Sequence, residues 1–202
     1  MSTLKLFLMG LSFQGAVIFT VGTAYAEGSS VLIQQIGDYN EADVAVEGES
    51  EASSLELLQE GNSNVSDIAL SGVENVGTIE QQGNHHLADI LISGNNNQFS
   101  ISQTGVAEIV EHRNSILLRQ EGVNNIATHT QIGTGNSQSL AQLGNDNTAD
   151  LLQDGNGNSL ILEQRGDLNS ATLTQYGDTA APIEIYQSGG TAIQIIHNAG
   201  GS

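Results

Sequence analysis

The chain of 202 residues lacks most of the residues that stabilise ordinary folds. It has no cysteine, one proline, no tryptophan and only 4% aromatic residues. The missing cysteines exclude a disulfide framework, and so few bulky side chains cannot build the core of a compact globular domain of this size. There are 24 glycines, and Asn, Gln and Ser are frequent. This composition alone would allow disorder, but the spacing of these residues does not.

Basic residues are also scarce, with 4 Lys and Arg against 23 Asp and Glu. Residues 1–26 have the features of a secretory signal peptide: Lys5 precedes an apolar stretch, and Ala24 and Ala26 form a small-x-small cleavage site. The stretch is short and interrupted by glycine, so we expect cleavage and no membrane span afterwards. Cleavage leaves a net charge of 3 − 23 = −20. Such a surface repels nucleic acid and anionic lipid, so neither is a predicted partner.

An 11-residue repeat, Asn-x-apolar-x-apolar-x-Gln-x-Gly-x-x, runs through the rest of the chain. It is clearest from Asn147 to Gly155. Fifteen arms can be placed, each with a glycine eight residues after its start, and extra residues interrupt the count around 49–52, 106–113 and 178–181. The arms begin at Ser29, Asn40, Ser53, Asn64, Asn75, His86, Asn97, Asn114, Asn125, Asn136, Asn147, Asn158, Asn169, Ala181 and Ala192.

Alternating inward and outward residues within each arm predict a strand, and the glycine that follows predicts a tight turn. A strand of about seven residues buries nothing alone, so the arms must stack. The sequence therefore predicts an all-β fold: a β-solenoid of about seven and a half two-strand coils of 22 residues, stacked about 4.8 Å apart as in amyloid.

Stacking places like residues above one another in columns. We expect the Gln and Asn side chains of successive coils to form hydrogen-bonded ladders that serve self-assembly. In the early even-numbered arms the Gln position is filled instead by Val46, Leu70 and Ile92. The predicted ladder residues are Gln35, Gln59, Gln81, Gln103, Gln120, Gln131, Gln142, Gln153, Gln164, Gln175, Gln187, Asn114, Asn125, Asn136, Asn147, Asn158 and Asn169, and the predicted turn glycines are Gly122, Gly133, Gly144, Gly155, Gly166 and Gly177.

Three outward carboxylates, Asp43, Asp67 and Asp89, occupy one position in arms two, four and six. Stacking would hold them about 5 Å apart, where like charges oppose one another. We interpret them as acidic gatekeepers that delay aggregation before export, rather than as a cation site.

The C-terminal arms depart most from the repeat. Placing the last arm at Ala192 turns Ile193, Ile195 and His197 outward and Ile196 inward, and puts Gly200 in the turn. Residues 27–189 are thus the predicted solenoid, and residues 190–202 are a degenerate arm for which a cap or docking element is one interpretation.

The stretch Gln120-Glu-Gly122-Val-Asn-Asn125-Ile-Ala127-Thr-His-Thr-Gln131, with Gln142–Gln153 and Gln164–Gln175, resembles the curlin repeat of curli fibre subunits, and the resemblance extends from residue 29 to about 189. It implies an extracellular functional amyloid of Gram-negative bacteria, which forms biofilm and adhesive fibres. It also implies an outer-membrane secretion channel and a partner nucleator subunit. The chain could be the major subunit or the nucleator.

Several other functions fit the sequence less well. The histidines lack metal-ligand spacing, so no metal site or cofactor is predicted. A calcium-binding β-roll would need paired glycines and a fixed Asp in nine-residue units. The 106–113 insertion carries Glu108, Glu111 and His112 but is more typical of a surface loop than of an enzyme cleft, so the chain is not a predicted enzyme. A non-polymerising acidic solenoid that binds a partner stays open as the alternative.

Overall fold

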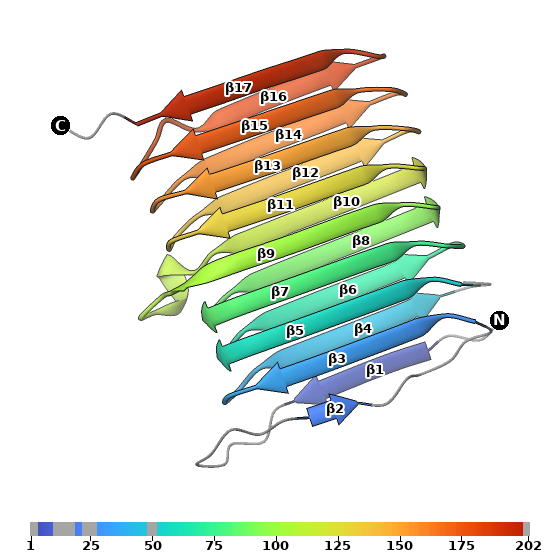
Figure 1. Cartoon of the computed structure of the whole chain (residues 1–202), viewed down its shortest axis with the longest axis vertical. Helices are drawn as coiled ribbons and strands as arrows, with labels where there is room; N and C mark the ends of the chain where they lie inside the picture. Colours follow the sequence, from blue (N-terminus) through green and yellow to red (C-terminus); the bar gives the residue numbers. More distant parts are fainter. Residues whose placement is uncertain (1–3, 10–18, 22–27, 48–51, 200–202) are drawn as a thin grey trace.

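The computed structural model of the chain describes residues 4–9, 19–21, 28–47 and 52–199. Two parallel β-sheets lie face to face, and the chain alternates between them at each turn (Figure 1). We call them the odd and even sheets after their strand numbers. The odd sheet contains β3 (Ser30–Ile36), β5 (Ser54–Asn62), β7 (Val76–Asn84), β9 (Gln98–Val106), β11 (Ile126–Ile132), β13 (Thr148–Asp154), β15 (Ser170–Tyr176) and β17 (Ala192–Asn198). The even sheet contains β4 (Glu41–Glu47), β6 (Val65–Ser71), β8 (Leu87–Asn95), β10 (Ser115–Val123), β12 (Ser137–Leu143), β14 (Ser159–Arg165) and β16 (Ile183–Ser188).

Successive strands of one sheet pair in parallel with the repeat in register. Gln131 lies opposite Gln153, for example, and Gln142 opposite Gln164. Two short strands, β1 (Leu4–Met9) and β2 (Phe19–Val21), add antiparallel to β4 and β3 at the N-terminal end. Without them the sheets of 9 and 8 strands hold 8 and 7 strands of the repeat. The predicted all-β solenoid of seven and a half coils is confirmed.

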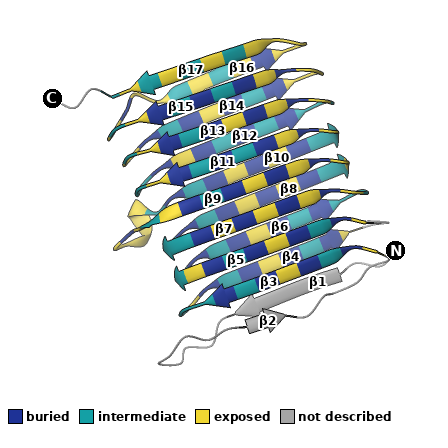
Figure 2. Ribbon diagram, viewed as in Figure 1, coloured by how far each residue is buried: buried dark blue, intermediate teal, exposed yellow. Residues whose placement is uncertain are grey.

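Burial alternates along the strands, as Figure 2 shows by its bands of buried and exposed residues. In β13 the residues Ala149, Leu151 and Gln153 are buried, whereas Thr148 and Asp150 are exposed. Inward Val, Ile, Leu and Ala from both sheets form one core that extends from Val31 to Leu173. No helix in the described segments is long and apolar enough to cross a membrane.

The last two arms differ from the sequence prediction. Ala180, not Ala181, occupies the buried Asn position. The turn at Gly189 and Gly190 is one residue shorter than the others. The N–H of Gly190 donates to the Asp167 carbonyl, a bond that in the other turns comes from one residue further along the chain.

This shortened turn reverses the faces of the last strand, since a slip of one residue turns every side chain over. Thr191 therefore stands above Asn169 and His197 above Gln175. Ile193 and Ile195 point inward onto the core, and Ile196 is 61% exposed. The predicted orientations of Ile193, Ile195, Ile196 and His197 were wrong. Ala199 rather than Gly200 takes the glycine position above Gly177.

The 106–113 insertion leaves the odd sheet after β9 and contains a short 3-10 helix, Val110–His112, visible at the edge of the stack in Figure 1. It adds six residues without disturbing the register, since Gln103 still meets Gln131 directly above it. Most of the first predicted insertion, around 49–52, lies outside the described residues.

Candidate functional site

The Gln side chains of each sheet form a continuous ladder inside the solenoid. In the odd sheet each Nε2 donates to the Oε1 one coil above, from Gln35 to Gln175, over 2.7 to 3.2 Å. In the even sheet the same bonds run from Gln120 to Gln187 over 2.8 to 2.9 Å. All the bonds point from the N-terminal to the C-terminal end, so each ladder has a direction.

From Gln59 upward, the second proton of the amides ties the two sheets together. Gln59 Nε2 also donates to the carbonyl of Glu41 in the even sheet, and Gln142 Nε2 to that of Ile126 in the odd sheet, both over 3.0 Å. Both protons of a buried amide are thereby satisfied, as burial requires. A shorter or apolar side chain at this position cannot make both bonds.

The Asn column at the start of each arm closes the turns. Each Asn oxygen accepts the backbone N–H of the residue stacked above it. The N–H of Asn147, for example, donates to Asn125 Oδ1 at 3.1 Å. Each Nδ2 from Asn40 to Asn158 donates over 2.7 to 3.0 Å to the carbonyl of a turn glycine one coil higher. Both hydrogen bonds therefore tie the Asn to the coil above, one to its strand and one to its turn.

The turn glycines are required by contact between coils. A Cβ on Gly144 would lie 2.2 Å from the carbonyl oxygen of Gly166, and one on Gly122 would lie 2.0 Å from that of Gly144. Both residues also have a positive φ, 140° and 119°, a region that L side chains rarely adopt. Turns of neighbouring coils thus touch through backbone alone.

Two features of the turns were not anticipated from the sequence. The residue before the column position is left-handed in most turns, as at Tyr39 before Asn40 and His85 before His86, whereas Arg113 before Asn114 has a φ of −69°. Side chains outside the core also link the turns at both edges of the stack: Asn62, Asn84, Asn95, Asn145, Asn156, Asp167 and Asp178 each accept the backbone N–H of the turn one coil below. The recurring Gly-Asn and Gly-Asp pairs were the visible signal for these links.

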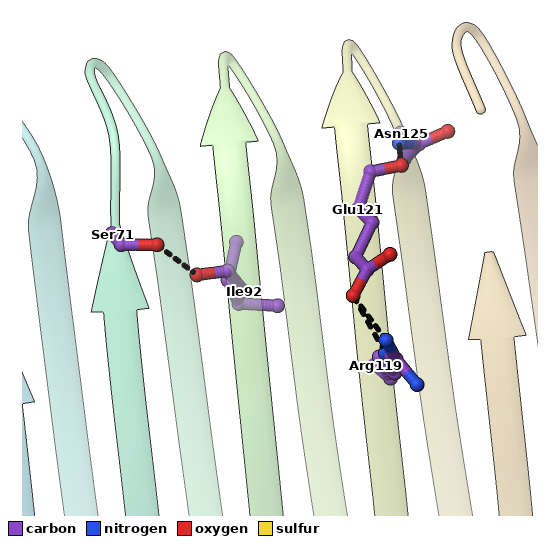
Figure 3. A network of polar contacts seen from close by, with 5 residues as sticks. All are labelled: Ser71, Ile92, Arg119, Glu121 and Asn125. Carbon is purple, nitrogen blue, oxygen red and sulfur yellow. Dashed lines mark hydrogen bonds and ion pairs between the residues drawn. The ribbon is translucent and has the colours of Figure 1, made fainter. Parts of the chain in front are cut away.

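Figure 3 shows the edge of the stack where even strands turn back to odd ones. Asn125 Nδ2 donates to the carbonyl of Glu121 at 3.4 Å, and the Glu121 carboxylate pairs with Arg119. Lower in the same sheet, the Ser71 hydroxyl of β6 donates to the carbonyl of Ile92 in β8 at 3.3 Å.

The Gln and Asn columns of the even sheet are both irregular near β8 and β10. Gln120 stands directly above Ile92, so its Oε1 has no donor below and is buried without a partner within the described residues. In the Asn column of β8 the position is filled by His86, whose Nε2 contacts the carbonyl of Gln82 at 3.0 Å. Burial, the largest effect, lowers the pKa of His86.

A second polar pair interrupts the apolar core. His129 is fully buried between Ile101 and Leu151, and its Nδ1 lies 3.0 Å from Oε1 of Gln138 in the even sheet. Because the Gln138 amide donates to the Thr130 carbonyl, its oxygen accepts, and Nδ1 carries the proton. Nε2 is then a buried atom without a hydrogen-bond partner among the residues described. Burial lowers the pKa of His129 to about 4.

The predicted acidic column is present on the outward face of the even sheet. Asp67 lies opposite Asp43 on one side and Asp89 on the other. Partial burial, followed by repulsion from Asp89 and Asp43, raises the pKa of Asp67. The column ends at β10, where Leu117 follows Asp89.

The 106–113 insertion packs against the turns of neighbouring coils. Ala107 is buried, and its carbonyl lies 3.2 Å from His85 Nδ1. A shallow hollow of about 250 Å³ lies beside it, lined partly by Tyr39, His85, Val110 and Arg113. Among the side chains that the structure describes, no three His, Asp or Glu residues are grouped so that they could hold a metal ion.

All the predicted ladder glutamines and asparagines are buried, and they stand in one Gln column and one Asn column in each sheet. Their geometry is that of a ladder; that the ladder serves self-assembly is still a prediction. The predicted turn glycines lie in the turns with positive φ, and Asp43, Asp67 and Asp89 are brought together, while their gatekeeper role is likewise a prediction.

Comparison with known proteins gives one match. The family described as curlin associated repeat matches residues 72–105 and 144–177. No curated protein and no solved structure matches the chain. The two matched segments lie one in each half of the stack, and the same backbone register joins them to the arms between and around them. The chain thus carries the curlin associated repeat in each half of the stack.

Proposed function

We propose that the chain is a secreted subunit that assembles with copies of itself into extracellular curli-like amyloid fibres, used in biofilm matrix and surface adhesion. The observation that carries this proposal is the constant cross-section of the stack. Each coil presents to the next a parallel strand pair with amide, aliphatic and glycine positions in register, so the end of one copy is a template for another.

Export and partners follow from the same proposal. Residues 1–26 would direct secretion, an outer-membrane channel would release the chain, and another fibre subunit would serve as nucleator or as the nucleated partner. Both the major and the nucleating role suit a stack of this kind. The proposed function is structural and not catalytic.

Incubation of the secreted chain with thioflavin T, together with electron microscopy, tests the proposal. A fibre subunit gives a lag followed by growth, removal of the lag by preformed seeds, and visible fibrils. A chain that stays monomeric at concentrations of tens of micromolar would refute it.

A non-polymerising acidic solenoid that binds a partner is the second candidate. It is favoured by the exposed apolar residues of the insertion, Val106, Ile109 and Val110, which are 63%, 48% and 50% exposed on a chain with a net charge of −19. The thioflavin experiment separates the two candidates, because a binding module gives no growth curve.

A further inference from the structure

Two buried polar atoms without partners stand at opposite ends of the odd Gln column. Gln35 begins the column, and its Oε1 finds no donor within the described residues. His197 takes the Gln position at the other end, above Gln175, and its Nδ1 is buried without a partner there. Buried polar atoms of this kind are uncommon and call for an explanation.

The two atoms are complementary in chemistry. An amide oxygen can only accept a hydrogen bond, whereas an imidazole ring nitrogen can carry a proton and donate it. The ladder bonds point from the N-terminal toward the C-terminal end, so Gln35 lacks a donor from below. His197 stands at the upper end of the same column, where it would supply this donor to Gln35 of a copy stacked on top.

The even column offers no such match. It begins with the aliphatic Val46 and ends with Gln187, whose Oε1 accepts from Gln164. Gln187 Nε2 is already bonded at 3.0 and 3.1 Å to the carbonyls of Ser170 and Thr191. The even ladder is therefore closed within the chain.

The strand count gives the same asymmetry. The odd sheet has one repeat strand more than the even sheet, so β17 extends beyond β16 at the C-terminal end (Figure 1). When β17 meets β3 of another copy at the usual spacing of about 4.8 Å, β16 and β4 of the two copies lie about 9.6 Å apart. One strand is then missing between them.

We propose that copies of the chain join head to tail through the odd sheet alone. β17 of one copy pairs in parallel with β3 of the next, and the His197 ring N–H donates to Gln35 Oε1, while a strand-wide opening separates the two even sheets. This inference rests on the proposed fibre function and specifies its joint.

The joint requires removal of the leader, because β2 pairs with β3 at Gln35 and occupies the edge that β17 would take. Removal leaves the solenoid intact: β1 pairs only with β4, β2 only with β3, and the apolar core begins at Val31. The experiment therefore uses the chain exported by its own leader.

Cysteine cross-linking tests directly which of the two sheets forms the joint, since the chain has no cysteine of its own. With Gln35 of the next copy above His197, the outward residues Gln194 and Leu32 face each other across the joint. The double variant Gln194→Cys, Leu32→Cys should form disulfide-linked multimers during fibre growth, because adjacent strands hold Cα atoms within the roughly 4.4–6.8 Å that a disulfide spans.

The matched control is the even pair Tyr186→Cys, Ala45→Cys, two outward residues that each stand one residue before the Gln column position of their strand. A gap of about 9.6 Å should prevent its cross-linking. Cross-linking of the even pair, or fibres of the odd pair without cross-links, would overturn the joint. If the unmodified chain makes no fibres at all, the proposed function fails first and the joint fails with it.

The hydrogen bond has its own test in seeded growth. His197→Gln keeps a donor at this position and should elongate within about twofold of wild type, whereas His197→Leu should elongate about tenfold more slowly, as expected for loss of one buried hydrogen bond. His112→Leu, in the exposed insertion, is the control and should not change the rate. Equal rates for His197→Leu and wild type would contradict the donation to Gln35.

Discussion

The lower and upper halves of the even sheet place different side chains on the same backbone. In the lower half, β4, β6 and β8 put Val46, Leu70 and Ile92 at the column position where β10, β12, β14 and β16 of the upper half have glutamine. On the outward face the lower half stacks three aspartates, whereas the upper half continues with Leu117, Ser139 and Ile161.

The comparison shows that the register does not depend on the even ladder. The odd glutamines already tie both sheets together in the lower half, as Gln59 does through the Glu41 carbonyl, so the even position there can be aliphatic. In the upper half the even glutamines supply a second tie. Stability in the lower half therefore rests more on apolar burial, and in the upper half more on amide hydrogen bonds.

The largest effect should be common to both halves, because both stack their turns through glycine. Gly72→Ala and Gly144→Ala would place a Cβ 1.9 and 2.2 Å from a carbonyl oxygen above. Each should lower the free energy of unfolding by about 3 kcal/mol or more, from overlap and backbone strain. Urea unfolding followed by circular dichroism measures it.

Gly190→Ala is the control for strain alone, since Gly190 has a positive φ but a Cβ added there would meet no atom within 4 Å. It should cost about 1 kcal/mol. A lower-half glycine variant as mild as Gly190→Ala would mean that the coils there are not in backbone contact.

The second effect is a loss of stability in acid that originates beside the upper half of the even sheet, where His129 of β11 contacts Gln138 of β12. Burial lowers the pKa of His129 to about 4, whereas the pKa of the unfolded side chain stays near its ordinary value of 6.5. The unfolded state therefore binds more protons between these values, and stability falls as the pH falls through this window, by up to about 3 kcal/mol. The free energy of unfolding, measured at about pH 7 and pH 4.5, gives the change, because most of the window lies between these two values.

The double variant His129→Leu, Gln138→Leu removes this pair and restores an aliphatic core like that around Leu151 and Leu173. Its unfolding free energy should depend less on pH between 6.5 and about 4 than that of wild type. The same pH dependence in both proteins would show that His129 is not the group responsible; His86, whose pKa is also lowered, would then be the next candidate.

Exchanging the column residues between the halves should cost stability in either direction. Gln142→Leu removes one hydrogen bond each from the Ile126 carbonyl, the Gln120 Nε2 and the Gln164 Oε1, a loss of about 2–3 kcal/mol. Leu70→Gln buries an amide between Val46 and Ile92 and should cost about 1–3 kcal/mol. Thr148→Ala, on the exposed face, should cost under about 0.5 kcal/mol. Slower fibre growth should follow the same order.

The sequence was sufficient to predict the solenoid, because a strand period of two and a glycine every eleven residues admit few other folds. Inward positions such as Gln153 followed from that period. The last strand was assigned wrongly because the short turn at Gly189 and Gly190 moves the register by one residue, and glycines carry no side-chain pattern that would reveal it. The contact of His129 with Gln138 joins opposite sheets, so it required the three-dimensional arrangement of the coils.

The smallest effect should be a gain of stability in acid that originates in the lower half. Partial burial and the neighbouring Asp89 and Asp43 raise the pKa of Asp67 above its ordinary value of 3.8. The folded state then holds this proton more tightly than the unfolded state. Stability from this group is therefore gained as the pH falls toward 3.8 and lost as the pH rises through the raised pKa.

Asp67→Asn imitates the protonated side chain and should be more stable than wild type at neutral pH, with a difference that shrinks as the pH approaches 3.8. Asp150→Asn is the control, because it removes an equal charge from a residue that stacks between Thr128 and Thr172. Seeded fibre growth of Asp67→Asn should also exceed that of wild type at neutral pH, since less repulsion opposes stacking. If Asp67→Asn and Asp150→Asn change stability and growth alike, the three aspartates act as ordinary surface charge, and the gatekeeper role must be abandoned.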